Sequence, residues 1–190
     1  MRQLLFFFAV VLVLVSCSRE TDSNSFDSNN LNDKTALNKK INLVEDSLKY
    51  HYNLIVNNKV DSLPSSMIQR AIALYESYYH KFPNDSLTPT YLDKIHQLHT
   101  QEKRYLYAVN CVDTLLQNYP NYSHKAEVLY SAATTSDLYL LDTNRIKRYY
   151  KRMLVDCPKL KKKVKVEIEK RLSNLKYPYL EYLKISSTAH

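Results

Sequence analysis

The residue types best suited to metal chemistry lie in one short stretch, Asp93, His96 and His99, with Glu102 following. Carboxylate and imidazole groups are ordinary zinc ligands, and a spacing of three residues brings them along one helix. A small metal-dependent enzyme or a metal-binding protein could use Asp93, His96 and His99 in this way. Such a site also needs a ligand from a distant element, and no recognisable motif supplies one. We therefore predict that no metal is bound and that these residues are structural.

The elements that position this stretch repeat along the chain. The segment AIALYESYYHKFP at 71–83 returns in outline as AVNCVDTLLQNYP at 108–120 and as IKRYYKRMLVDCP at 146–158. The three closing prolines lie 37 and 38 residues apart. Within each segment, the positions twelve, eight and four residues before the proline share one helical face. This period leaves room for one further helix between successive prolines, which predicts an all-α fold of stacked antiparallel hairpins.

Helical periodicity extends over residues 41–176 and predicts about seven helices joined by short loops. The pattern resembles the tetratricopeptide-repeat family, whose repeats carry a small residue twelve positions, and an aromatic residue eight positions, before the proline. Ala71, Tyr75 and Pro83 match both positions, and the later copies match in part. The family's small residue five positions before the proline is replaced by bulky ones, which predicts looser packing of the hairpins: Tyr78, Leu115 and Met153.

The turns Phe82–Ser86 and Tyr119–Ser123 are more similar to the divergent repeats of bacterial envelope lipoproteins. That group includes the helical-repeat component of the outer-membrane β-barrel assembly machine. The resemblance implies a non-enzymatic adaptor in which the first helix of each hairpin lines a groove for another envelope protein or peptide. A role in outer-membrane assembly is one that this resemblance suggests. On the family register, five residues would face this groove: Thr90, Lys94, Gln97, Glu127 and Ser131. An inert spacer or an immunity-type envelope protein would share the same fold.

Glycine is absent from all 190 residues, whereas about thirteen would be expected at the usual frequency of roughly 7%. Glycine-rich phosphate loops, dinucleotide fingerprints and nucleophile elbows all need backbone positions that glycine fills most easily. No convergent set of nucleophile, base and orienting residue is recognisable either. We therefore predict a protein that is not an enzyme and that binds no cofactor.

The start of the chain has the form of an export signal. Met1–Ser16 carries Arg2 and then twelve apolar residues, which as a helix would reach about 18 Å and cannot cross a hydrocarbon core of ~30 Å. The sequence Leu-Val-Ser-Cys at 14–17 resembles the lipobox of bacterial lipoproteins, which implies cleavage before Cys17 and its acylation. In the family's sorting rule, Ser18 after the acylated residue favours the outer membrane. The predicted location is thus the cell envelope, with a lipid anchor at Cys17.

Two flanking segments are expected to lie outside the folded domain. Residues 17–40 are rich in Ser, Asn, Asp and Thr and hold few apolar side chains, which predicts a flexible linker. At the other end, Pro178 follows the last periodic stretch, so residues 177–190 are predicted to form a tail.

Basic residues are concentrated towards the carboxyl end. Residues 145–176 hold 13 of the 27 Lys and Arg but only 3 of the 19 Asp and Glu. Such a patch could bind anionic headgroups or an acidic partner, through residues that include Arg148, Lys161, Lys162 and Lys163. The alternative is a solvated helix face. Nucleic acid is not expected as a partner of an exported protein.

Two cysteines remain within the repeats, Cys111 and Cys157. Their positions relative to the closing prolines differ by eight residues, or about 12 Å of helical rise, whereas bridged Cα atoms lie within about 7 Å. We expect two free, buried thiols.

Overall fold

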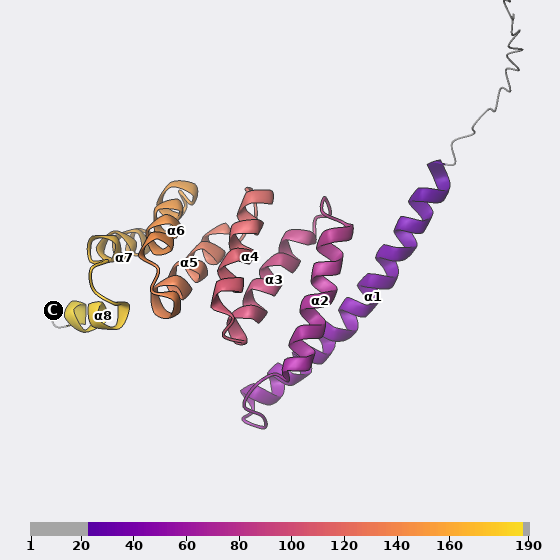
Figure 1. The fold of residues 1–190 in the computed structure, drawn as a ribbon, viewed down its shortest axis with the longest axis horizontal. Coiled ribbons are helices and arrows are strands. Elements are labelled where there is room, and N and C mark those ends of the chain that lie inside the picture. Colours follow the sequence, from indigo (N-terminus) through magenta and orange to yellow (C-terminus); the bar gives the residue numbers. More distant parts are fainter. Residues whose placement is uncertain (1–22, 188–190) are drawn as a thin grey trace, which may run out of the picture.

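The computed structural model describes residues 23–187, and side chains over most of that range. Figure 1 shows an elongated array of helices with no strand in the described residues, which confirms the predicted all-α class. None of these helices is long and apolar enough to cross a membrane. Eight α-helices and one short π-helical segment, η1, follow in order: α1 (Ser23–Val56), α2 (Ser65–Lys81), α3 (Thr88–Gln101), α4 (Tyr105–Asn118), α5 (Lys125–Thr135), η1 (Ser136–Leu140), α6 (Thr143–Asp156), α7 (Lys162–Ser173) and α8 (Tyr179–Ser187).

Each helix up to α7 packs mainly against the helices before and after it in sequence, so the hairpins stack as predicted. The ends of the three repeated helices are nearly identical in backbone conformation. Phe82 after α2, Tyr119 after α4 and Cys157 after α6 have φ of −130°, −130° and −121° and ψ of 57°, 68° and 71°. Each donates its N–H to the carbonyl four residues back and is followed by a proline, which cannot continue the helix.

The core lies on the repeated face. Ala71, Ala108 and Ile146, twelve residues before the prolines, are all buried. The bulky residues five positions before the prolines are also buried, with relative exposures of 0%, 0% and 1%: Tyr78, Leu115 and Met153. Hairpins with alanine there could approach more closely, but here the larger side chains fill the space between them. These side chains are therefore part of the packed core, and the looser approach of the hairpins stays a prediction.

The amino-terminal boundary of the domain lies earlier than predicted. The flexible linker proposed for 17–40 is contradicted from Ser23 onward, because α1 begins there and runs 34 residues. Leu37 is buried against the core, and Lys34 forms an ion pair with Asp85 in the turn after α2. A second ion pair joins Asp33 to Lys81 at 3.0 Å. The burial of Leu37 and these two ion pairs stabilise helical structure in a segment that composition alone predicted to be flexible.

The predicted tail at 177–190 is also wrong for most of its length. Pro178 does not end the structure, since its carbonyl accepts a hydrogen bond from the Tyr182 N–H at 2.9 Å in the first turn of α8. The rings of Tyr179 and Tyr182 lie 5.7 and 5.1 Å from the Arg171 guanidinium of α7. The helix α8 also contacts η1, so it belongs to the folded domain.

A buried ion pair joins this carboxyl end to the rest. Arg171 donates from Nε and Nη2 to the two carboxylate oxygens of Asp137, at 2.7 and 2.6 Å. The same guanidinium donates to the carbonyls of Asn174 and Tyr177, at 2.7 and 3.0 Å. Arg171 and Asp137 are 3% and 2% exposed. Asp137 lies in η1, where the π-helical turn sets its orientation, and Leu141 ends that turn with a positive φ of 52°.

Candidate functional site

The parallel helices α1 and α3 border a cleft whose floor includes Tyr75 of α2. The two helices are in register, because the contacts Glu45–Lys94 and Tyr52–Gln101 both join residues 49 positions apart. The cleft has a volume of about 420 Å³ and is lined by residues of three helices: Glu45, Asp46, Leu48, Lys49, Tyr52, Asn53, Tyr75, Lys94, Gln97 and Leu98.

Lys94 is fixed within this cleft. Its ammonium group pairs with the Glu45 carboxylate and lies 5.7 and 5.5 Å from the ring centres of Tyr75 and Tyr91. The two rings stack at 5.0 Å, and the Tyr75 hydroxyl donates to Glu45 at 3.0 Å. Burial raises the pKa of Tyr75 strongly, and raises that of Tyr91 to about 12, so both phenols stay protonated. Lys94 therefore stabilises the α1–α3 contact in addition to lining the cleft.

The polar side chains that remain available line the edges of the cleft. Asp46, Lys49 and Asn53 are exposed on α1, and Gln97 is exposed on α3. Gln97 donates to Asp93 at 3.1 Å, which leaves its amide oxygen facing solvent. The predicted helical periodicity begins at residue 41 and covers this part of α1, but the sequence did not single out the three polar residues on it. A usable signal existed: Ile41, Val44 and Leu48 define its buried face and place these residues beside it.

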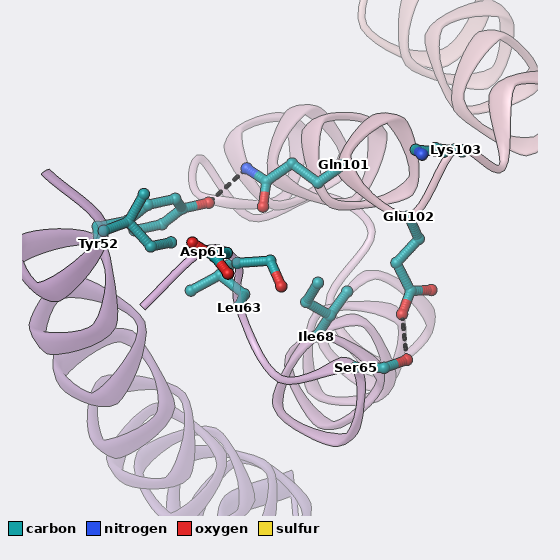
Figure 2. A pocket seen from close by; sticks show the side chains of 10 residues that line it. Tyr52, Asp61, Leu63, Ser65, Ile68, Gln101, Glu102 and Lys103 are labelled. Carbon is teal, nitrogen blue, oxygen red and sulfur yellow. Dashed lines mark hydrogen bonds between the residues drawn. The ribbon is translucent and has the colours of Figure 1, made fainter. Parts of the chain in front are cut away.

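A second cleft of about 730 Å³ adjoins the first at Tyr52, which lines both. Figure 2 shows Tyr52 accepting a hydrogen bond from Gln101, while Ser65 at the start of α2 donates to Glu102 at 2.6 Å. The loop at 61–63 forms its other wall, next to Ile68. Together the two clefts provide a surface along the α1 side of the first hairpins.

The five predicted groove residues do not form one set. Lys94 and Gln97 line the cleft between α1 and α3. Ser131 instead donates towards a buried imidazole, and Thr90 interacts with Tyr122 of the next turn. Glu127 lines a separate cleft of about 550 Å³ beside Cys157, between α5 and the turn after α6. The family register thus placed these side chains at equivalent points of successive helices but did not bring them together.

The residues of the alternative metal site, Asp93, His96 and His99, are likewise not assembled. His96 is 1% exposed, its Nδ1 donates to the Ala108 carbonyl at 3.0 Å, and its Nε2 accepts from Ser131 Oγ at 2.8 Å. Both ring nitrogens are therefore used within the protein. Asp93 accepts from the Tyr122 hydroxyl at 3.0 Å, and His99 packs against the Tyr107 ring. Within residues 23–187, no three His, Cys, Asp or Glu side chains are grouped to hold a metal ion.

These contacts predict a pH dependence of stability. Burial lowers the pKa of His96, and the folded protein holds the neutral ring, whereas the unfolded chain has an ordinary pKa near 6.5. As the pH falls through about 6.5, the unfolded chain takes up the proton first, so the free energy of unfolding decreases. Burial and then Arg104 lower the pKa of His99 as well, which adds to the same slope.

Urea unfolding at pH 7.5 and pH 5.5 measures this effect. His96→Gln is expected to reduce the loss of stability between the two pH values. A His96→Gln chain with the full wild-type loss would show that the acid sensitivity arises elsewhere.

The predicted basic patch is divided. Arg148 on α6 donates to Asp113 of α4 at 2.7 Å and stacks on the Tyr149 ring, so it joins two repeats. Lys161, Lys162 and Lys163 are exposed at the start of α7.

Cys111 is half-buried and Cys157 is buried, and both thiols are free. Burial raises the pKa of both, to about 11 for Cys111. The predicted lipid attachment at Cys17 lies outside the described residues.

Neither a scan against protein-family models nor a search of curated proteins gave a match to this chain.

Proposed function

We propose that the protein is a non-enzymatic adaptor that holds a segment of another envelope protein in the cleft between α1 and α3. The observation that supports this role is the cleft itself, where two parallel helices present exposed amide and charged side chains on both sides of an aromatic floor. Of the five predicted groove residues, Lys94 and Gln97 lie together in this cleft.

The chemistry of the lining favours an extended peptide. Asn53 and Gln97 can each donate to and accept from a peptide backbone, whose N–H and C=O groups are the commonest partners for amide side chains. Asp46 and Lys49 can pair with charged side chains, and Tyr52 offers a ring with little conformational entropy to lose. The cleft of about 420 Å³ has room for a few side chains, and the adjoining one beyond Tyr52 extends the track.

A pre-formed cleft supports binding because little has to be ordered when the partner arrives. The Glu45–Lys94 pair and the stacked rings of Tyr75 and Tyr91 hold α1 against α3 in the free protein. The same contacts make Lys94 a poor site for testing the proposal, since its substitution would also disturb the helix packing.

The proposal includes attachment to the membrane through acylated Cys17, with the outer membrane as the preferred site. Ser23, where α1 begins, is six residues beyond Cys17. An extended chain of that length reaches at most about 20 Å, which is shorter than the spacer expected from sequence. An anchored protein would therefore hold the start of α1 close to the bilayer, and Glu45 at the cleft would lie up to about 33 Å further along this helix.

Site-specific photo-crosslinking in intact cells tests the cleft. A photoreactive amino acid at Gln97 is expected to capture one or a few discrete envelope proteins, which mass spectrometry identifies. The matched control is Gln117, an equally exposed glutamine at the end of α4 and outside the cleft. Asn53→Arg should then reduce capture at Gln97 by about tenfold or more, because it places a bulky charge where an amide is needed. Equal capture at Gln97 and Gln117 would refute the cleft as the binding site.

A further inference from the structure

The carboxyl end of the fold carries a group of lysines that the structure leaves without counter-charges. Seven lie between residues 159 and 176, and in the described part of the chain none of them forms an ion pair: Lys159, Lys161, Lys162, Lys163, Lys165, Lys170 and Lys176. In the first half, Lys34, Lys81 and Lys94 are paired with a carboxylate, and the unpaired lysines there are more widely spaced along the chain. The positive charge at this end is therefore available to an external anion.

The adjacent helix α8 exposes apolar side chains. Leu180 and Leu183 are 66% and 42% exposed, and they lie three residues apart on neighbouring positions of one helix face. The neighbouring face of α8 is held in place, because Tyr179 and Tyr182 contact the buried Arg171. Leu183 lines the same cleft as these two rings, and the more exposed Leu180 lies further round the helix towards solvent.

The lysines and the leucines meet at the same surface. Lys170 of α7 lines a cleft of about 390 Å³ together with Leu183, Tyr179 and Tyr182 of α8. Lys163 lies seven residues before Lys170, on the same face of α7. Glu167 lies between them and also lines the cleft, yet residues 159–187 hold nine Lys and Arg against three Glu, so the surface stays positive.

We infer that α7 and α8 form a surface that docks onto an anionic lipid bilayer, with the lysines at the headgroups and Leu180 and Leu183 inserted below them. The presence of unpaired lysines next to exposed apolar side chains identifies the partner. An anionic membrane attracts each nearby Lys electrostatically and also accepts apolar side chains, whereas nucleic acid or an acidic protein segment would require only the charge. The helix α8 is too short to span a bilayer, so it would lie on the membrane surface.

The position of this surface adds a geometric consequence. The helices α7 and α8 lie at one end of the long axis of the molecule, and the beginning of α1 lies at the other end (Figure 1). Contact of α7 and α8 with the membrane that also holds Cys17 would lay the array along the bilayer. The inference is independent of what the α1–α3 cleft binds, and it does not require that Cys17 be acylated.

Sedimentation with vesicles tests the inference. The unlipidated chain beginning at Ser18 keeps every described helix, because α1 begins at Ser23. It is expected to bind vesicles of phosphatidylcholine with about 30% phosphatidylglycerol, and to bind pure phosphatidylcholine vesicles at least about tenfold more weakly. Lys163→Glu/Lys170→Glu and Leu180→Ser/Leu183→Ser should each lower the binding constant for the anionic vesicles by about tenfold or more.

Matched controls lie on α1. Lys39→Glu/Lys40→Glu makes the same change in net charge, and Leu43→Ser/Val56→Ser removes two apolar side chains that are 59% and 79% exposed; both should bind like the wild type. Far-UV circular dichroism checks that each variant keeps its helices. Absence of binding to anionic vesicles would overturn the inference. So would unchanged binding by the leucine variant, which would indicate a purely ionic surface suited to an acidic protein or nucleic acid.

Discussion

Asp137→Ala is expected to lower the free energy of unfolding by about 3–5 kcal/mol, because it leaves the Arg171 guanidinium buried without its carboxylate. Arg171 is 3% exposed. The two parallel hydrogen bonds to Asp137 are the main contact that orients it towards the carbonyls after α7. Loss of the pair should release α7 and α8 first, with a fall in helicity before the main transition.

Urea unfolding followed by far-UV circular dichroism, together with hydrogen exchange of α7 and α8, measures this loss. Arg152→Ala is the control, since it removes an exposed ion pair to Asp156 four residues along the same helix and should cost only about 0.5 kcal/mol. The double variant Asp137→Leu/Arg171→Met should regain part of the stability, because it removes both buried charges. Recovery is expected to be incomplete, since the carbonyls of Asn174 and Tyr177 lose their donor. A single variant as stable as the wild type would show that the ion pair does not hold this end.

Leu115→Ala is expected to destabilise the protein by about 2–5 kcal/mol. Leu115 is completely buried in α4, five residues before Pro120, at the position where the tetratricopeptide pattern has a small residue. If the hairpins could move closer and fill the space left by Leu115→Ala, the loss of stability would be small. The equivalent residues of the other two repeated helices, Tyr78 and Met153, are bulky and buried as well, so we expect the spacing of the hairpins to persist and a cavity to remain.

Thermal and urea unfolding measure this second effect. Leu106→Ala is a matched control because it makes the same substitution in the same helix at a side chain that is 50% exposed, and it should cost less than about 1 kcal/mol. Equal losses for the two variants would mean that the repeats tolerate either size at the buried position.

The second prediction concerns a position where a local pattern was readable but its consequence was not. The proline period identified three equivalent helix ends, which the structure repeats with nearly equal backbone angles at Phe82, Tyr119 and Cys157. The family resemblance then suggested loose packing at Leu115 and its equivalents, and those residues proved to be fully buried. Periodicity reports which face is apolar, whereas the distance between helices depends on how side chains of different repeats fill the common space.

The candidate site was likewise only partly predictable from the sequence. Lys94 and Gln97 were identified from the register of a single helix, and they do line a cleft. Their partners on α1 were missed, because Glu45 lies 49 residues from Lys94 and nothing in the local pattern of α1 indicates which helix it will face. His96 was readable as a histidine at ligand spacing, but its two hydrogen bonds come from Ala108 and Ser131 on later helices.

The amino-acid sequence by itself determined the class of fold, the period of its hairpins and the points at which the repeated helices end. These properties depend on apolar spacing and on prolines, which act within a few residues of their own position. Only the tertiary structure decided that residues 23–40 and 179–187 are helical, that Asp137 meets Arg171, and that α1 and α3 enclose a cleft. These outcomes depend on contacts between residues some 30 to 50 positions apart, which form only once the hairpins have stacked.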